Sequence, residues 1–207
     1  MSDGEQEVIE TERKFDVPAG FALPSLTGPG VARMAPPDVL HLSATYFDTA
    51  GLRLIAAKIT LRRRTGGTDA GWHIKLPVSA DTRRELHFPL GEAELEVPAP
   101  VAAEVAQWTG GQPLRPVARL ETRRTVRRLL DPAGQVLAEV ADDTVTGSRP
   151  DPADPTQWRL ADRWRELEVE LVSGNRNLLN ATAGQLRAAG AQPSPSASKL
   201  ARVLAAS

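Results

Sequence analysis

The stretch Trp164-Arg165-Glu166-Leu167-Glu168-Val169-Glu170-Leu171 alternates acidic and apolar side chains at every second position. This period is that of a β-strand with one acidic face and one apolar face. Carboxylates stacked on one side of a strand repel one another, so we expect cations or a cationic partner opposite them. The apolar face requires a packed cover.

A second segment, Glu10-Thr11-Glu12-Arg13-Lys14-Phe15, repeats the alternation near the N-terminus and places Lys14 in line with Glu10 and Glu12. A solvated face of an antiparallel sheet would explain either segment by itself. The functional interpretation therefore depends on how many strands share the pattern.

The composition limits the chemistry of the chain. Its 207 residues are enough to bury a core without disulfides, and we expect a single domain over residues 1–207 with a core at about 7–202. It contains no cysteine, which excludes disulfides and thiolate–metal sites, and only three histidines, which favours oxygen ligands for any metal. No apolar run is long enough to span a bilayer, and residues 1–5 lack the order of a signal peptide. We therefore expect a cytoplasmic, soluble protein without a membrane partner.

The formal net charge of −1 argues against a general nucleic-acid binder, which usually carries a basic excess. The charge is nevertheless separated, because the arginines gather in the middle of the chain and the strand carboxylates lie toward its ends. Monomer and homodimer remain equally open.

Alternating segments recur along the chain. We expect strands at about residues 7–16, 41–48, 58–65, 72–78, 83–89, 117–130, 135–145 and 164–171. Residues 52–57 suit either a strand or a helical turn, and 148–156 suit a surface loop. We expect helices near residues 23–26, 98–108, 175–189 and 197–206.

About eight strands joined mostly by hairpins predict an α+β fold built on an antiparallel eight-stranded β-barrel. Small barrels usually have an apolar lumen, but the charged faces here are too regular to point at random into water. We therefore expect a polar tunnel, with helices covering the faces that carry Leu167, Val169, Leu171, Ile74 and Leu76. Such a lumen must be wet, and each charge in it needs a partner or a ligand.

Two sets of charged side chains are expected to face this lumen. The basic set is Lys14, Arg62, Arg64, Lys75, Arg83 and Arg124. It would bind a polyanion, because guanidinium groups grip phosphate oxygens in bidentate fashion. The acidic set is Glu10, Glu12, Asp143, Glu168 and Glu170. It would repel that polyanion unless a divalent cation lay between them, and oxygen ligands beside phosphate favour Mg²⁺ or Mn²⁺.

Several motifs resemble those of the CYTH superfamily, also called triphosphate tunnel metalloenzymes. Glu10 to Lys14 is similar to its ExExK signature, and Glu166 to Glu170 is similar to its late ExExE strand. The segments between and after them, in the family's order, are Tyr46-Phe47-Asp48-Thr49 (YYDT), Leu61 to Arg64 (LRxR), Trp72 to Pro77 (WxxKxP), Arg83-Arg84-Glu85 (RxE) and Ser198 to Arg202 (SKxxR). The resemblance covers about Glu7 to Arg202.

The resemblance implies a tunnel that binds a triphosphate-containing substrate and a divalent metal, and usually hydrolyses the substrate. The implied metal ligands or their outer sphere are Glu10, Glu12, Asp143, Glu168 and Glu170, with Glu139 and Glu166 as lesser members. The implied phosphate-binding residues are Lys14, Arg62, Arg64, Lys75, Arg83 and Arg124, with Lys199 closing the tunnel or contacting phosphate. The residues expected to be catalytic are Glu10, Glu12, Lys14, Glu168 and Glu170. The choice of Arg124 stays open, because Arg123, Arg127 and Arg128 compete with it.

Other conspicuous residues have structural explanations. We expect His73 and His87 at the tunnel wall or rim rather than on a metal, since the acids suffice. The tryptophans suit packing. The arginines expected on a solvated surface are Arg13, Arg127, Arg128 and Arg163.

Three functions remain open. The first is metal-dependent hydrolysis of inorganic tripolyphosphate or a related organic triphosphate, with release of orthophosphate. The second is a class IV-type adenylate cyclase that makes cyclic AMP from ATP, although no base-stacking cluster is visible among the few aromatic residues. The third is a non-catalytic module that binds polyphosphate or nucleotides.

Overall fold

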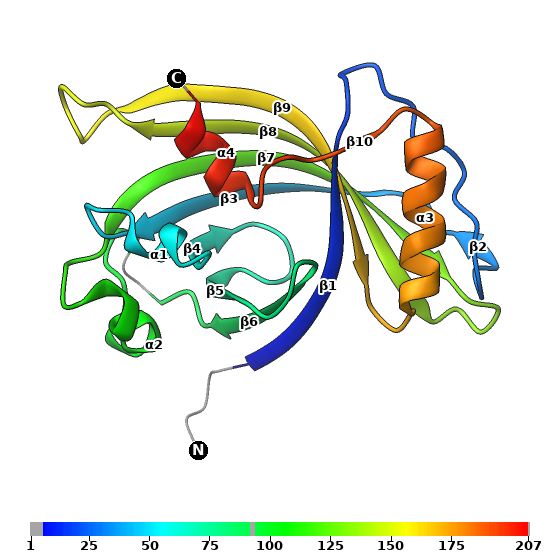
Figure 1. Cartoon of the computed structure of the whole chain (residues 1–207), viewed down its shortest axis with the longest axis horizontal. Coiled ribbons are helices and arrows are strands. Elements are labelled where there is room, and N and C mark those ends of the chain that lie inside the picture. The colour runs from blue at the N-terminus through cyan, green and yellow to red at the C-terminus, as the bar shows by residue number, and fades with distance from the viewer. Residues whose placement is uncertain (1–5, 92–93, 207) are drawn as a thin grey trace.

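Long antiparallel strands form the main body of regular structure in the protein (Figure 1). The computed structural model describes residues 6–91 and 94–206. The strands are β1 Gln6–Asp16, β2 Arg33–Met34, β3 Asp38–Asp48, β4 Thr60–Thr65, β5 Gly71–Pro77, β6 Thr82–Phe88, β7 Arg115–Leu130, β8 Val136–Pro150, β9 Trp158–Leu171 and β10 Gln192–Pro193. The helices are α1 Arg53–Ala56, α2 Ala99–Thr109, α3 Arg176–Ala188 and α4 Lys199–Ala205.

The sheet closes on itself through β1. The first half of β1 pairs with β6 and its second half pairs with β9, both antiparallel. The order around the barrel is β1-β6-β5-β4-β3-β7-β8-β9 and back to β1. Eight of the ten strands therefore form a closed barrel, and the two-residue strands β2 and β10 extend it at β7 and β1. This confirms the antiparallel eight-stranded barrel predicted from the sequence.

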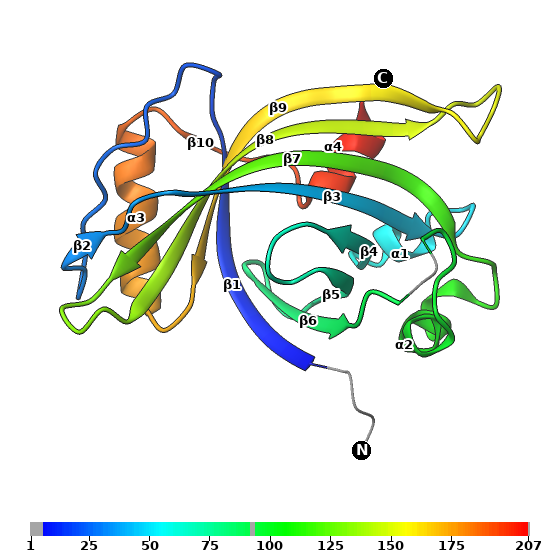
Figure 2. The same cartoon turned by 180° about the vertical axis from the view of Figure 1, so that it is seen from behind.

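Helices cover the outer faces of the barrel at its two ends. Leu178 and Leu186 of α3 pack in one cluster with Leu167 and Val169 of β9. At the opposite end of the long axis, α1 and α2 cover β4, β5 and β6, where Val105 of α2 joins a second cluster around Trp72 and Ile74 (Figure 2). The expectation that helices cover these apolar faces is confirmed.

The last helix, α4, packs on the inner face of the barrel instead. Its Leu200 and Val203 belong to a third cluster with Tyr46, Val145 and Trp164. Trp164 shares the strand face of Glu166 and Glu168, and α4 lies within the curve of β8 and β9 (Figure 1). The helix therefore fills one end of the barrel interior. Gly147 permits this close approach, since a Cβ at that position would overlap Val203.

Some expected boundaries differ in the structure. The helix predicted near Leu23–Leu26 is wrong: the segment has no regular structure, and it contains Pro24, which cannot donate a backbone hydrogen bond. Strands β8 and β9 extend beyond the predicted ends and continue pairing to Pro150 and Trp158, so the loop between them is shorter than expected. Residues 52–57, left open as strand or helical turn, contain the short helix α1.

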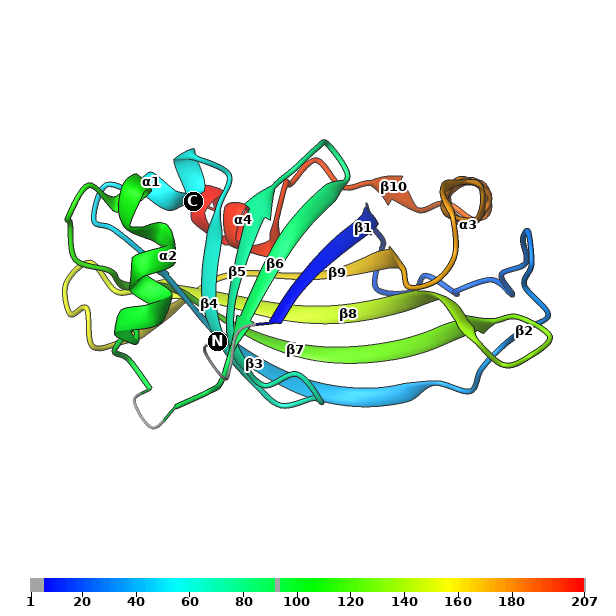
Figure 3. The same cartoon turned by 90° about the horizontal axis from the view of Figure 1, so that it is seen from below.

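Viewed from below, β1 and β6 run side by side, and β7 lies between β3 and β8 (Figure 3). The strands thus surround a central space from all sides, and their inward side chains determine what it holds. Among the described residues, no helix is long and apolar enough to cross a membrane.

The Tyr46-Phe47-Asp48-Thr49 motif supplies a structural carboxylate. Asp48 is fully buried at the end of β3. Its oxygens accept hydrogen bonds from the backbone N–H groups of Thr49, Leu54 and Ile55 at 2.7, 2.9 and 3.0 Å. Asp48 therefore fixes the turn into α1 and satisfies donors that this short helix leaves unpaired.

We expect Asp48→Ala to lower the free energy of unfolding by roughly 2–4 kcal/mol, because it leaves buried N–H groups without an acceptor. Asp48→Asn retains one acceptor oxygen and should lose less. Urea unfolding measures both variants. A loss below about 1 kcal/mol for the alanine variant would show that the carboxylate does not hold this turn.

Candidate active site

A cavity of about 220 Å³, here called the tunnel cavity, lies inside the barrel. Its charged lining residues are Glu10, Glu12, Lys14, Arg62, Arg64, Asp69, Lys75, Glu85, Arg124, Glu139, Glu168, Glu170 and Lys199. Strands on every side of the barrel contribute to this set. The alternation read from the sequence thus places acidic and basic side chains on the inner face, as expected for a polar lumen.

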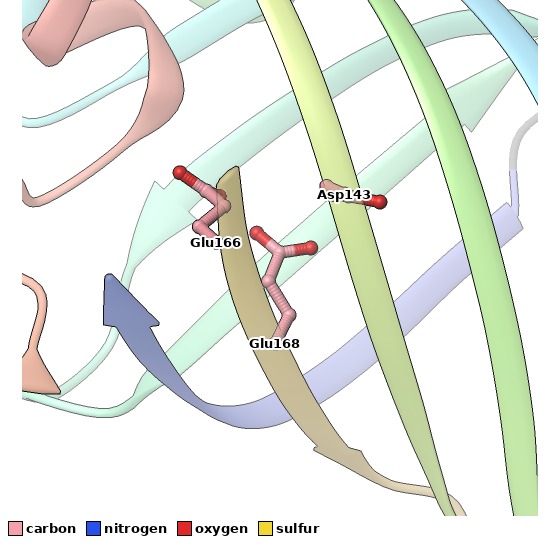
Figure 4. A group of neighbouring side chains, drawn as sticks. All are labelled: Asp143, Glu166 and Glu168. Carbon is pink, nitrogen blue, oxygen red and sulfur yellow. The ribbon is translucent and has the colours of Figure 1, made fainter. Parts of the chain in front are cut away.

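Three carboxylates, those of Asp143, Glu166 and Glu168, meet around one ammonium group. Their ligand atoms lie within 4.8 Å of one another, on the neighbouring strands β8 and β9 (Figure 4). Nζ of Lys199, at the start of α4, lies 3.0 Å from Asp143, 2.6 Å from Glu166 and 2.7 Å from Glu168. The ammonium of Lys199 neutralises this group of acids and ties α4 to the barrel wall.

Arg124 also forms ion pairs with two of these acids. Its guanidinium donates to both oxygens of Asp143, at 2.8 and 2.7 Å, and to Glu168 at 2.6 Å. Arg123 is exposed on the other face of β7, and Arg128 pairs with Glu139 and Asp38. Of the arginines on this strand that the sequence could not distinguish, Arg124 therefore points into the barrel.

A second network lies around Lys14 and Lys75. Lys14 contacts Glu12 at 3.1 Å and Glu168 at 2.5 Å, and Lys75 is paired with Glu10. Glu12 and Glu168 raise the pKa of Lys14 although burial opposes its charged form, so this ammonium stays protonated. Each lysine bridges carboxylates that would otherwise repel one another.

Glu85 connects the basic residues of this network. It accepts from Nδ1 of His73 at 2.9 Å and lies 3.5 Å from Arg62 and 3.9 Å from Lys75. Although burial opposes ionisation, the hydrogen bond from His73 and the charge of Lys75 hold the pKa of Glu85 below its ordinary value. The predicted site residues did not include Glu85. Its place on the inward face of the strand that also carries Arg83 was the signal for it.

Glu170 lacks a cation of its own. Among the described residues, its side chain makes no hydrogen bond and no ion pair within 4 Å, and across the sheet it faces Glu12 on one side and Glu139 on the other. Burial, followed by the nearby charges of Glu12 and Glu168, raises the pKa of Glu170 to about 7. Burial and a hydrogen bond with Glu85 raise the pKa of Glu10 to about 8. Carboxylates therefore outnumber cations in this part of the tunnel cavity.

This excess of carboxylate fits a divalent cation with hard oxygen ligands. Glu10, Glu12, Glu168 and Glu170 line the tunnel cavity, but no three of these four carboxylates bring their ligand atoms within 4.8 Å of one another. Within the described part of the chain, only Asp143, Glu166 and Glu168 place their ligand atoms within 4.8 Å of one another, and Lys199 already neutralises them. Of the predicted metal ligands, Asp143 and Glu168 thus belong to this group, whereas Glu10, Glu12 and Glu170 line the cavity without converging on one point.

Arg83 differs from its expected place. It does not line the tunnel cavity, and its guanidinium donates to the backbone carbonyls of Ser79 at 3.0 Å and Thr82 at 3.3 Å. Because β6 begins at Thr82, Arg83 lies at the end of the strand, where its side chain turns toward the hairpin backbone. It instead lines a second, outer cavity, here called the vestibule, together with Lys58 and Arg187.

The other residues singled out in the sequence mostly have structural roles. His73 is buried in the wall, and its ring lies 4.6 Å from that of His87. Trp72 and Trp164 are buried in the packed clusters. Arg13 lies outside the tunnel cavity and donates to Asn180.

The CYTH domain family matches residues 8–204. Two uncharacterized proteins of Mycobacterium tuberculosis, MT2285 of strain CDC 1551 / Oshkosh and Rv2226 of strain H37Rv, are each 41% identical to this chain over 207 residues. The match covers 96% of this chain and 40% of each relative. The chain therefore spans about two fifths of the length of these curated relatives.

Solved structures with the same fold include a candidate adenylate cyclase from Bacillus halodurans, with a TM-score of 0.59 and 18% identity over 95% of this chain and 97% of that chain. Another is HpAC1 from Hippeastrum, a candidate adenylyl cyclase with a dominant triphosphatase activity. It has a TM-score of 0.53 and 15% identity over 96% of this chain and 95% of that chain. At these identities the likeness shows the fold.

We expect Lys199→Met to lower the melting temperature in EDTA by roughly 5–15 °C, because it leaves buried carboxylates without their shared cation. Mg²⁺ or Mn²⁺ should restore more stability to this variant than to the wild type, since the ion can occupy the vacated position.

Arg202→Met is the matched control, because Arg202 lies on the same helix but pairs with the half-exposed Asp16 and Asp162. Its smaller loss should not respond to metal. Equal losses and equal metal responses in the two variants would contradict the role of Lys199.

Proposed function

Because the chain belongs to the CYTH domain family, we propose that it is a divalent-metal-dependent triphosphatase that hydrolyses inorganic tripolyphosphate. The observation that carries this proposal is the tunnel cavity, in which basic side chains and an excess of carboxylates line the same enclosed space. Basic groups suit the phosphates, and the surplus acids suit the ion that accompanies them.

The size and lining of the tunnel cavity favour a compact polyanion over a nucleoside. Its volume of about 220 Å³ is below the range of about 300–1,000 Å³ typical of sites for drug-sized ligands. Its aromatic lining residue is Tyr46, whose hydroxyl lies 3.5 Å from Arg62. With this single ring held beside Arg62, the cavity offers little for a base to stack on, and the lining supports a linear phosphate chain held by Lys14, Arg62 and Arg124.

Binding would exchange internal ion pairs for pairs with the substrate. Lys14, Lys75 and Arg124 are each paired with a carboxylate in the structure. We place the divalent cation among Glu10, Glu12, Glu168 and Glu170, whose side chains would turn toward it on binding; Mg²⁺ or Mn²⁺ held there would supply charge neutralisation and a more acidic water. The basic residues would then hold and orient the phosphates and stabilise charge on the transferring group. Water would attack a terminal phosphorus, and tripolyphosphate would yield orthophosphate and diphosphate.

A cyclase is the second candidate, because proteins with this fold include candidate adenylate cyclases. It requires a place for the nucleoside outside the tunnel cavity, and the dominant triphosphatase activity of HpAC1 supports hydrolysis on this fold. A binding module without turnover is the third. These candidates differ in what they release, so product analysis separates them.

The test is phosphate release from tripolyphosphate, ATP and thiamine triphosphate side by side, with Mg²⁺ and then Mn²⁺. We expect tripolyphosphate to be hydrolysed fastest and EDTA to abolish release. Cyclic AMP as the main product from ATP would replace the proposal with a cyclase. Tight binding without turnover of any compound would replace it with a binding module.

We expect Glu168→Gln to lower turnover of tripolyphosphate about 100-fold or more, because Lys14, Lys199 and Arg124 all use this carboxylate. Glu121→Gln is the control, since Glu121 is exposed on β7 and hydrogen-bonded to Ser43. Melting temperatures of both variants distinguish lost catalysis from lost folding. Undiminished phosphate release by the Glu168 variant would remove this residue from the site.

A further inference from the structure

The vestibule is a cavity of about 860 Å³. A smaller cavity of about 120 Å³, here called the passage, shares lining residues with both the vestibule and the tunnel cavity. The passage shares Glu12, Lys14 and Lys75 with the tunnel cavity, and it shares Lys58 and Arg83 with the vestibule. These shared walls place the passage between the tunnel cavity and the vestibule.

Cations of the vestibule differ from those of the tunnel cavity in their partners. Lys58, Arg83 and Arg187 have no carboxylate partner within 4 Å among the residues at 6–91 and 94–206, and Arg83 donates only to backbone carbonyls. In contrast, Lys14 and Lys75 are bound to carboxylates. The positive charge of the vestibule is therefore available to an anion that comes from solvent.

The acids that line the vestibule are already neutralised. Asp81 accepts from Arg176 at 2.6 Å, and Glu12 lies 3.1 Å from Lys14. The remaining lining is formed mainly by alanine, proline and serine residues. The net charge that an incoming ligand meets is thus positive.

Away from the passage, the exposed acids of the tunnel cavity are paired with arginines. Asp69 and Glu139 line this cavity, with side chains 55% and 37% exposed. The arginines beside them, Arg64 and Arg128, are paired with these same acids. A polyanion therefore meets unpaired cations in the vestibule, whereas the arginines beside Asp69 and Glu139 are already paired.

Lining chemistry also limits which anion fits. Phe15 is the aromatic residue of the vestibule, and only 2% of its surface is exposed, so no ring is available to stack on a base. Lys58 adopts a φ of 61°, a left-handed conformation that is costly for a residue with a side chain. This backbone places a lysine where the passage meets the vestibule.

We propose that the vestibule binds the phosphates beyond the third in longer inorganic polyphosphate chains, so that the protein processes such chains from an end held in the tunnel cavity. This inference rests on the proposed triphosphatase function. Each step breaks the terminal phosphoanhydride bond with one water and leaves orthophosphate and a chain shorter by one unit. The remaining chain stays in contact with Lys58, Arg83 and Arg187.

The experiment compares steady-state hydrolysis of tripolyphosphate and of a polyphosphate of about fifteen units by the wild type and by Lys58→Gln, Arg187→Gln and the double variant. Glutamine removes the charge but keeps a polar, unbranched side chain, and it does not change the backbone cost at Lys58. The double variant should raise KM for the long chain roughly tenfold and change KM for tripolyphosphate less than about threefold. Arg123→Gln, on the exposed outer face of β7, should leave both unchanged.

Equal effects on both substrates, or no effect on the long chain, would overturn the inference. If the proposed triphosphatase function itself is wrong, the wild type will hydrolyse neither substrate, so the two failures can be distinguished. In that case, titration of the long chain into the protein in EDTA decides the inference. Weaker binding by the double variant supports the vestibule as a phosphate-chain site, and unchanged binding rejects it.

Discussion

Charged groups enclosed in a barrel must neutralise one another or bind a ligand, and this constraint governs the whole structure. Closure of the sheet through β1 brings Glu12 opposite Glu170 and Lys14 opposite Glu168. Carboxylates from distant parts of the sequence therefore share a small volume, and lysine and arginine side chains lie between them. Where these cations suffice, the acids are ionised and paired. Where they do not, as at Glu170, burial and neighbouring acids raise the pKa of the carboxyl group to about 7.

Helix α4 shows how the fold supplies one of these cations. Its apolar side packs inside the barrel through Leu200 and Val203, and its first residue, Lys199, extends to the acids on β8 and β9. The same packing that fills one end of the lumen thus delivers a charge to its interior. Internal pairs of this kind contribute little net stability, because desolvation offsets their attraction. They hold the basic side chains in place, and a phosphate chain can replace the carboxylates as partners of these side chains.

The barrel and most of its inward residues could be predicted from the sequence, because the two-residue period of a strand determines both the secondary structure and the direction of each side chain. Predictions were less accurate at the strand ends, where the alternation stops. Arg83 lies at a strand end, and its side chain turns outward. The role of Glu85 depends on contacts with His73 and Arg62, which lie on other strands and cannot be read from the local sequence pattern. The inner position of α4 depends on Gly147 and Trp164, which are distant in sequence. Asp48 belongs to a recognisable motif, yet its contacts are those of a structural cap.

The central claim is that phosphate and metal bind together in the tunnel cavity, each reducing the repulsion that the other meets. Calorimetric titration with a non-hydrolysable tripolyphosphate analogue, in Mg²⁺ and in EDTA, measures this coupling directly. The claim predicts that Mg²⁺ tightens binding at least about tenfold, and by reciprocity the analogue must tighten the binding of Mg²⁺ by the same factor. Equal affinity with and without the metal would contradict it.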